Sequence, residues 1–160
     1  MRAFPLSPGK DSWTRSMTSA INSPAPCETP SRILLVDDES SVRDSLYTLL
    51  ERGGYEVLAA SNGPDGLNIF RQSRRPIDLL VTNYNMPQMS GLELARECLK
   101  LRCELSVLYV SGSCPDEELQ AELQARKRGF LAKPFRGAEL LRKTRELLLA
   151  DSPGQLSLSH

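Results

Sequence analysis

The sequence predicts an α/β fold in which five helices cover a doubly wound, five-stranded parallel sheet. The first observation is that five short apolar runs alternate with five segments of helical character along the chain. The second is that the central run, residues 79–81, has no polar side, as expected for a strand buried on both faces of a parallel sheet. We therefore expect right-handed crossovers and the strand order 2-1-3-4-5.

The first half of the fold is predicted within residues 32–75. A strand at residues 33–36 precedes a helix that Ser41, with Asp44 three residues later, is expected to cap, and that Gly53-Gly54 is expected to end. A second strand at residues 55–60 leads into the turn 61–64. The proline of that turn suits the first turn of the next helix.

The second half begins with the strand at residues 77–82. Ser90 is expected to open the following helix, because a Ser with a Glu three residues later can satisfy two free N–H groups. After the strand 106–110, the helix that starts near Pro115 has few large apolar residues, so we expect it to be the most loosely held. The strand 129–132 ends beside Pro134, a candidate for a cis peptide bond, and a last helix follows.

The chain is expected to contain one domain. Residues 1–31 are rich in Ser and Pro and are predicted to form a flexible extension. Residues 32–149 form the predicted domain, and residues 150–160 form a polar C-terminal tail. Because no second ordered domain is predicted after the last helix, we expect no attached DNA-binding effector.

Composition excludes several functions. The 160 residues carry 20 Lys and Arg and 20 Asp and Glu, so no net basic charge favours nucleic acid or an anionic membrane. The basic clusters 74–75 and 126–128 are interpreted as cations at helix ends. No apolar run approaches the ~20 residues of a membrane helix, and no signal peptide is present, so we expect a cytoplasmic protein. The only histidine, His160, is the last residue, which excludes Ser-His and Cys-His catalysis.

The cysteines do not form a recognisable framework. None of the four is spaced as CxxC, which favours reduced thiols over a zinc site or disulfides. A redox sensor built on Cys98, Cys103 and Cys114 is a weak alternative. Cys98 lies among leucines on a helix face and is expected to be packed, whereas Cys114 precedes a helix start.

Polar side chains follow two strands that the predicted order makes neighbours. Asp37 and Asp38 come directly after the first strand, and Asn83 ends the third. Because ligands of open α/β sheets bind at the carboxyl ends of the strands, we expect these three side chains to converge.

Over residues 32–149 the chain resembles the receiver domains of bacterial two-component response regulators, which have the CheY-like, flavodoxin-like form of this fold. The resemblance is carried by LLVDDE, by DLLVTNYNMPQMSG at 78–91, by VSG at 110–112 and by FLAKPF at 130–135. In this order and spacing the motifs are highly specific.

The resemblance implies a role for each matching position. Asp37 and Asp38 match a Mg²⁺ site, an ion that prefers oxygen ligands, and the backbone carbonyl of Asn85 matches a further ligand. Three residues match the phosphoryl switch of the family. They are the hydroxyl at Ser111, the aromatic ring whose rotamer follows it at Phe130, and the phosphoryl-pairing lysine at Lys133.

The departure from the family is at Asn83, which stands where receivers carry the phospho-accepting aspartate. An amide is a poor nucleophile, so Asn83 is not expected to form an acyl phosphate. The loss of one negative charge is expected to weaken Mg²⁺ binding. Its carbonyl oxygen can still act as a ligand, and its NH₂ adds a donor that could bond Asp38 or Asp37 in place of the metal.

The leading hypothesis is a single-domain pseudo-receiver that acts by protein binding and is not an enzyme. Its implied partners are a sensor histidine kinase or another signalling protein, or a second copy of the chain. The implied surface combines the helix that starts near Pro115, the strand 129–132 and the last helix.

Two alternatives stay open. One is a phosphorylatable receiver whose acceptor is replaced or deamidated here, and the other is a phosphatase or nucleotide-binding enzyme on a similar sheet. The latter lacks the glycine-rich phosphate motifs and a core histidine.

Overall fold

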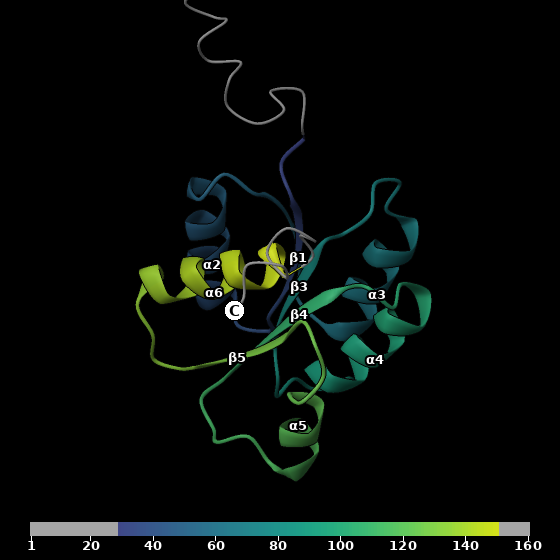
Figure 1. Cartoon of the computed structure of the whole chain (residues 1–160), viewed down its shortest axis with the longest axis vertical. Helices are drawn as coiled ribbons and strands as arrows, with labels where there is room; N and C mark the ends of the chain where they lie inside the picture. Colours follow the sequence, from purple (N-terminus) through teal and green to yellow (C-terminus); the bar gives the residue numbers. More distant parts are fainter. Residues whose placement is uncertain (1–28, 151–160) are drawn as a thin grey trace, which may run out of the picture. The chain divides into compact units, whose positions relative to one another are not determined.

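The computed structural model describes residues 29–150 (Figure 1), so most of the predicted extension 1–31 and of the tail 150–160 lie outside the described residues. Strands and helices alternate as predicted. In chain order they are β1 (Arg32–Val36), α2 (Ser40–Arg52), β2 (Glu56–Ala60), α3 (Gly63–Gln72), β3 (Leu79–Asn83), α4 (Gly91–Leu101), β4 (Ser106–Ser111), α5 (Glu117–Glu122), β5 (Arg128–Ala132) and α6 (Gly137–Leu149).

The five strands form one parallel sheet in the order β2-β1-β3-β4-β5, which confirms the predicted fold class and topology. Val36 of β1 pairs with Thr82 of β3, and Asn83 pairs with Val110 of β4. The carboxyl ends of these three strands therefore meet at one edge of the sheet, where the polar side chains were expected to converge.

Two helical layers cover the sheet because neighbouring residues of a strand point to opposite faces. In β1, Leu34 and Val36 pack into the layer formed by α3, α4 and α5. Ile33 and Leu35 pack into the layer formed by α2 and α6. Figure 1 shows α2 and α6 on one side of the sheet and α3 and α4 on the other. All four β1 side chains have no exposed surface, so β1 is the centre of both cores.

Most helix ends follow the predicted residues. The Ser90 hydroxyl accepts a hydrogen bond from the Glu93 N–H at 3.1 Å, and α2 stops before Gly53-Gly54, where Gly54 has a φ of +96°. The cap predicted at Ser41 is wrong, because α2 already begins at Ser40. The Asp37 carboxylate accepts the Glu39 N–H at 2.9 Å, which closes the turn before α2, and Glu39 takes the N-cap position two residues before Ser41. The Lys133-Pro134 bond is cis, as the sequence suggested.

The interpretation of the basic clusters as caps of their own helices is also wrong, because α3 ends at Gln72 and α5 ends at Glu122. Arg75 instead pairs with Glu56 of β2, and Arg128 pairs with Glu122 at 2.6 Å. Arg126 donates to the carbonyl oxygen of Ala150, at the end of a different helix, α6. These cations therefore join separate elements. Within residues 29–150, no helix has the length and apolar character needed to span a membrane.

Candidate functional site

The candidate site lies at the carboxyl edge of the sheet. Asp37 and Asp38 follow β1, Asn83 is the last residue of β3, Ser111 is the last residue of β4, and Lys133 follows β5 directly. Because the strands are parallel and adjacent, residues from four separate parts of the sequence reach the same edge. This placement is what the sequence predicted for the site.

The Asn83 side chain joins two of the predicted metal ligands. Its amide nitrogen donates to the Asp38 carboxylate at 2.9 Å and to the backbone carbonyl of Asn85 at 2.9 Å. The hypothesis that this amide bonds the acidic pair directly is therefore confirmed, with Asp38 as the acceptor. The neutral amide of Asn83 therefore donates to two oxygen atoms that the sequence predicts as ligands of a cation.

Asp37 is the buried member of the acidic pair, with 1% of its surface exposed. One carboxylate oxygen accepts the Glu39 N–H at 2.9 Å, whereas the other is buried and has no hydrogen-bond partner. The Lys133 ammonium lies 3.7 Å from that second oxygen. Burial raises the pKa of Asp37, and the Glu39 N–H and Lys133 oppose the shift only in part.

The predicted switch residues lie on β4 and β5. Ser111 is buried, its hydroxyl accepts the Ser113 N–H at 3.1 Å, and its carbonyl accepts the Lys133 N–H at 2.8 Å. Phe130 is half-buried, pairs in the sheet with Tyr109, and packs against the core under α3, α4 and α5. The structure therefore brings Ser111 and Lys133 to the same edge as Asn83, with Phe130 two residues inside β5.

Tyr84, directly after Asn83, is a site residue that sequence reasoning missed. Its hydroxyl donates to the Asp116 carboxylate, with oxygen distances of 2.9 and 3.0 Å, and links the site to the start of α5. Asp116 also caps α5 through the Leu119 N–H at 2.8 Å. The available signal was an aromatic residue at the end of a buried strand, but its partner lies 32 positions away.

Gly91 fixes the backbone beside Asn83. Its N–H donates to the Tyr84 carbonyl at 2.8 Å, and a Cβ atom at Gly91 would overlap the main-chain carbonyl of Asn83. The first turn of α4 can therefore approach the end of β3 only because residue 91 has no side chain.

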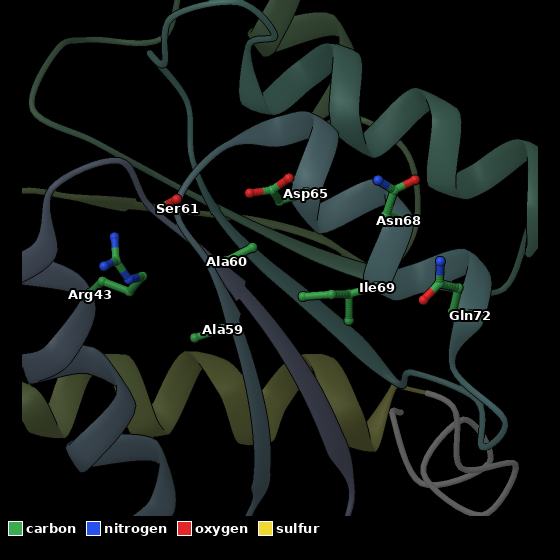
Figure 2. A pocket seen from close by; sticks show the side chains of 8 residues that line it. All are labelled: Arg43, Ala59, Ala60, Ser61, Asp65, Asn68, Ile69 and Gln72. Atoms are coloured by element: carbon green, nitrogen blue, oxygen red, sulfur yellow. The ribbon is translucent and has the colours of Figure 1, made fainter.

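Two hollows have no contribution from Asn83 to their lining. One, of about 530 Å³, lies where β2 ends between α2 and α3 (Figure 2), and Arg43 on its α2 side donates to the Asp37 main-chain carbonyl at 2.8 Å. The other, of about 420 Å³, is more apolar and lies between α2 and the segment after β5, with Lys133 and Phe135 in its lining.

The donor types at the site suit a hard cation only in part. Two carboxylates and the Asn85 carbonyl are the oxygen ligands that Mg²⁺ prefers, and the bare Asp37 oxygen is a further acceptor without a donor. However, Asn83 supplies an amide where a third carboxylate would complete the set, and its NH₂ already engages Asp38 and Asn85. Among residues 29–150, no group of three or more His, Cys, Asp or Glu side chains is placed to hold a metal.

Comparison with known proteins agrees with this fold. The sequence model of the response regulator receiver domain matches residues 33–145. Response regulator MprA of Mycobacterium avium (strain 104) is 38% identical over 122 residues, covering 76% of this chain and 53% of that protein. A second MprA, from Mycobacterium sp. (strain KMS), is 36% identical over 126 residues. The chain spans about half the length of the curated relatives it matches.

Solved structures give the same result. A response regulator receiver domain protein from Clostridium thermocellum is similar with a TM-score of 0.68 and 29% identity, covering 74% of this chain and 94% of that one. A CheY-like receiver domain protein from Methanospirillum hungatei JF-1 has a TM-score of 0.67 and 30% identity over the same shares.

Proposed function

This chain belongs to the response regulator receiver domain family of two-component signalling, and we propose that it is a receiver that accepts no phosphoryl group at Asn83 and acts by binding other proteins. Members of this family generally act as signalling domains that interact with histidine kinases and other signalling proteins. Under this proposal Asn83 occupies the phospho-acceptor position, and Asp37, Asp38, Asn85, Ser111, Phe130 and Lys133 have the roles that their motif positions imply.

The observation that carries the proposal is the double hydrogen bond of the Asn83 amide. An amide nitrogen shares its lone pair with its carbonyl, so it is a poor nucleophile, and it cannot yield the acyl phosphate that a carboxylate forms. The NH₂ group donates to Asp38 and to the Asn85 carbonyl, both at 2.9 Å. These bonds orient the side chain and hold the acidic loop and the β3–α4 loop together without a cation.

The proposal includes weakened Mg²⁺ binding. Asp37, Asp38 and the Asn85 carbonyl would hold the ion, which supplies charge neutralisation for a phosphoryl group when it is bound. To serve as a ligand, Asn83 would have to turn its oxygen toward that position and give up both hydrogen bonds. The loss of one formal negative charge acts in the same direction.

The finer parts of the proposal concern limits, partners and location. We place the receiver at residues 32–149, with a sensor histidine kinase or another signalling protein as partner and no nucleic acid contact by this segment. A homodimer would use α5, β5 and α6.

A cytoplasmic location is supported by the free thiols of Cys98, Cys103 and Cys114. Burial raises the pKa of Cys98 to about 12, which argues against that thiol as a redox sensor.

A second candidate function is a phosphorylatable receiver whose acceptor aspartate is replaced or deamidated at position 83. It is favoured by one observation. The buried Asp37 oxygen without a hydrogen-bond partner and the Lys133 ammonium near it lie at the same edge of the sheet as Asn83. The intact mass of the untreated protein distinguishes a deamidated chain from one that carries Asn.

Phosphodonor treatment tests both candidates. The wild-type protein and Asn83→Asp are incubated with acetyl phosphate and Mg²⁺, and intact mass measures phosphoryl transfer. We expect a phosphoryl adduct on Asn83→Asp and none on the wild type. The matched control is Asn68→Asp, which adds a carboxylate at an exposed position of α3 and is expected to stay unmodified. A phosphoryl adduct on wild-type protein that carries intact Asn83 would refute the proposal.

A further inference from the structure

Helix α5 is the helix least anchored by apolar contacts. It has six residues, Glu117–Glu122, and Leu119 is its only buried side chain. Every other helix in residues 29–150 is at least ten residues long and sets more than one apolar side chain against the core, since α3 adds the half-buried Ile69 and Phe70 to its buried Leu67. Polar contacts therefore have an unusually large share in fixing where α5 lies.

Those polar contacts differ in strength. The Arg96–Glu118 pair joins α4 to the first turn of α5 at 2.8 Å, but both side chains are about half exposed, so it contributes little. The end of α5 is held more firmly, by the largely buried pair between Arg128 and Glu122 at 2.6 Å. The start of α5 is held at its cap, where Asp116 accepts the Tyr84 hydroxyl.

Tyr84 is itself fixed on both sides. Its N–H donates to the Val110 carbonyl at 2.8 Å, and its carbonyl accepts the Gly91 N–H at 2.8 Å. Its ring meets the Tyr109 ring edge to face, with centroids 6.3 Å apart. Asn83 and Tyr84 are consecutive and both side chains are hydrogen-bonded, so the two bonded side chains share one stretch of backbone.

The loop between β4 and α5 is thus bonded at both ends to residues of the site. Its first part is held by the Ser113 N–H, which donates to the Ser111 hydroxyl at 3.1 Å. Its last residue, Asp116, is held by Tyr84. We propose that Tyr84 is a positioning residue that couples the Asn83 amide to this loop and to α5, and so fixes the position of α5 without phosphorylation. The coupling deepens the proposed function and rests on it.

Hydrogen–deuterium exchange of residues 112–122 tests the coupling in the full chain. Tyr84→Phe removes the hydroxyl and keeps the ring, so exchange of these amides is expected to rise by roughly tenfold or more, the effect of losing a hydrogen bond to a charged group. The matched control is Tyr109→Phe, which removes a hydroxyl that reaches Glu122 at 3.4 Å, at the other end of α5. It is expected to leave residues 112–116 unchanged.

The second step is a double-mutant cycle between Tyr84→Phe and Asn83→Ala. Asn83→Ala removes both amide hydrogen bonds, so it is expected to raise exchange in residues 112–116 while Tyr84 is present and to have little further effect in the Tyr84→Phe background. The proposed coupling would be overturned if the two substitutions raised exchange independently, so that their fold-changes multiplied in the double variant. It would also be overturned if Tyr84→Phe had no effect on exchange.

Asp116→Asn serves as a second variant, because Asn caps a helix as well as Asp does but weakens the bond to Tyr84. We expect it to raise exchange in the same amides, and unchanged exchange there would also contradict the coupling. The phosphodonor experiment reports on Asn83 chemistry alone, so a failure of the coupling and a failure of the proposed function are distinguishable.

Discussion

Asn83 changes the electrostatic balance of a site built from acceptors. Asp37 is buried beside it, and Asp38 and the Asn85 carbonyl accept both hydrogens of its amide. A carboxylate at position 83 would supply no donor and would add a third negative charge. The Asn83 amide therefore supplies two hydrogen bonds where a carboxylate would repel Asp37 and Asp38.

We expect Asn83→Asp to lower the free energy of unfolding by about 1–3 kcal/mol in metal-free buffer, because two hydrogen bonds are replaced by repulsion. Millimolar Mg²⁺ should restore part of the loss in the variant and have a smaller effect on the wild type. Urea unfolding followed by circular dichroism, with and without Mg²⁺, measures both effects. Asn68→Asp on the exposed face of α3 is the control. Equal stability of Asn83→Asp and wild type without metal would contradict this account.

Gly91 offers a second test at the residue scale. A methyl group on Gly91 would overlap the Asn83 carbonyl and also press on the Thr82 side chain, so Gly91→Ala must shift the end of β3. We expect a loss of about 1–3 kcal/mol from overpacking, with displaced NMR signals of the Asn83 side-chain amide. Gly112→Ala is the matched control, since a Cβ there meets no atom within 4 Å. Unshifted Asn83 signals in Gly91→Ala would show that the close approach is unimportant.

Some contacts of the site could be predicted from the sequence and others could not. Asp37, Asp38 and Asn83 could be predicted to converge, because each directly follows a recognisable strand and the strand order puts the two ends together. The Tyr84–Asp116 bond could not be predicted, because the direction of a side chain between two elements leaves no periodic pattern. The same holds for Arg128 and Glu122, whose pairing replaced the expected role of the basic cluster at a helix end.

At the scale of elements, local chemistry predicts helix starts well when the cap acts within its own turn. Ser90 satisfies the Glu93 N–H and Asp116 satisfies the Leu119 N–H, both three residues later. The start of α2 was misplaced because the Glu39 N–H is satisfied by Asp37, a residue of the site that lies before the helix. The expected cap was sought within the helix, whereas the residue that closes this turn precedes it.

The edge strand β2 gives a prediction about pH. Glu56 pairs with Arg32 of β1 at 2.8 Å and with Arg75 after α3, and the hydrogen bond from Arg32 is the main cause that holds the pKa of Glu56 below 4.5. A lowered folded-state pKa means that ionised Glu56 stabilises the fold at neutral pH, and that this contribution is lost as the pH falls below 4.5.

We therefore expect Glu56→Gln to lower the midpoint of thermal unfolding at pH 7, with a difference from wild type that shrinks below pH 4.5. Thermal unfolding followed by circular dichroism over a pH series measures the difference. Glu104→Gln, at an exposed loop position, is the control and should show no such convergence. A difference that stays constant with pH would rule out the ion pairs as its cause.

At the scale of the whole domain, the sheet joins two apolar layers into one cooperative unit. Residues 79–81 and the other buried runs predicted the parallel sheet, its order and both layers, because a strand without a polar face must be covered on both sides. The site lies where both layers end, so its geometry depends on each of them. The scarcity of large apolar residues predicted that α5 is the most loosely held helix, but the polar contacts that fix α5 could not be predicted, since they form only in the folded chain.

Leu34 and Leu35 test whether the two layers unfold together. Both have no exposed surface, but Leu34 packs into the α3–α4–α5 layer and Leu35 into the α2–α6 layer. Leu34→Ala and Leu35→Ala are each expected to cost about 2–5 kcal/mol, whereas Leu101→Ala, at a side chain that is 54% exposed, should stay within about 0.5 kcal/mol of wild type.

Because β1 belongs to both cores and ends at Asp37, we expect a single urea transition for both core variants, with circular dichroism and the NMR signals of the Asn83 side-chain amide changing together. Two separate transitions in either variant would mean that one layer can melt while the other stays folded. In that case the site would depend on one layer alone. The variant that loses the Asn83 signals in its first transition would identify that layer.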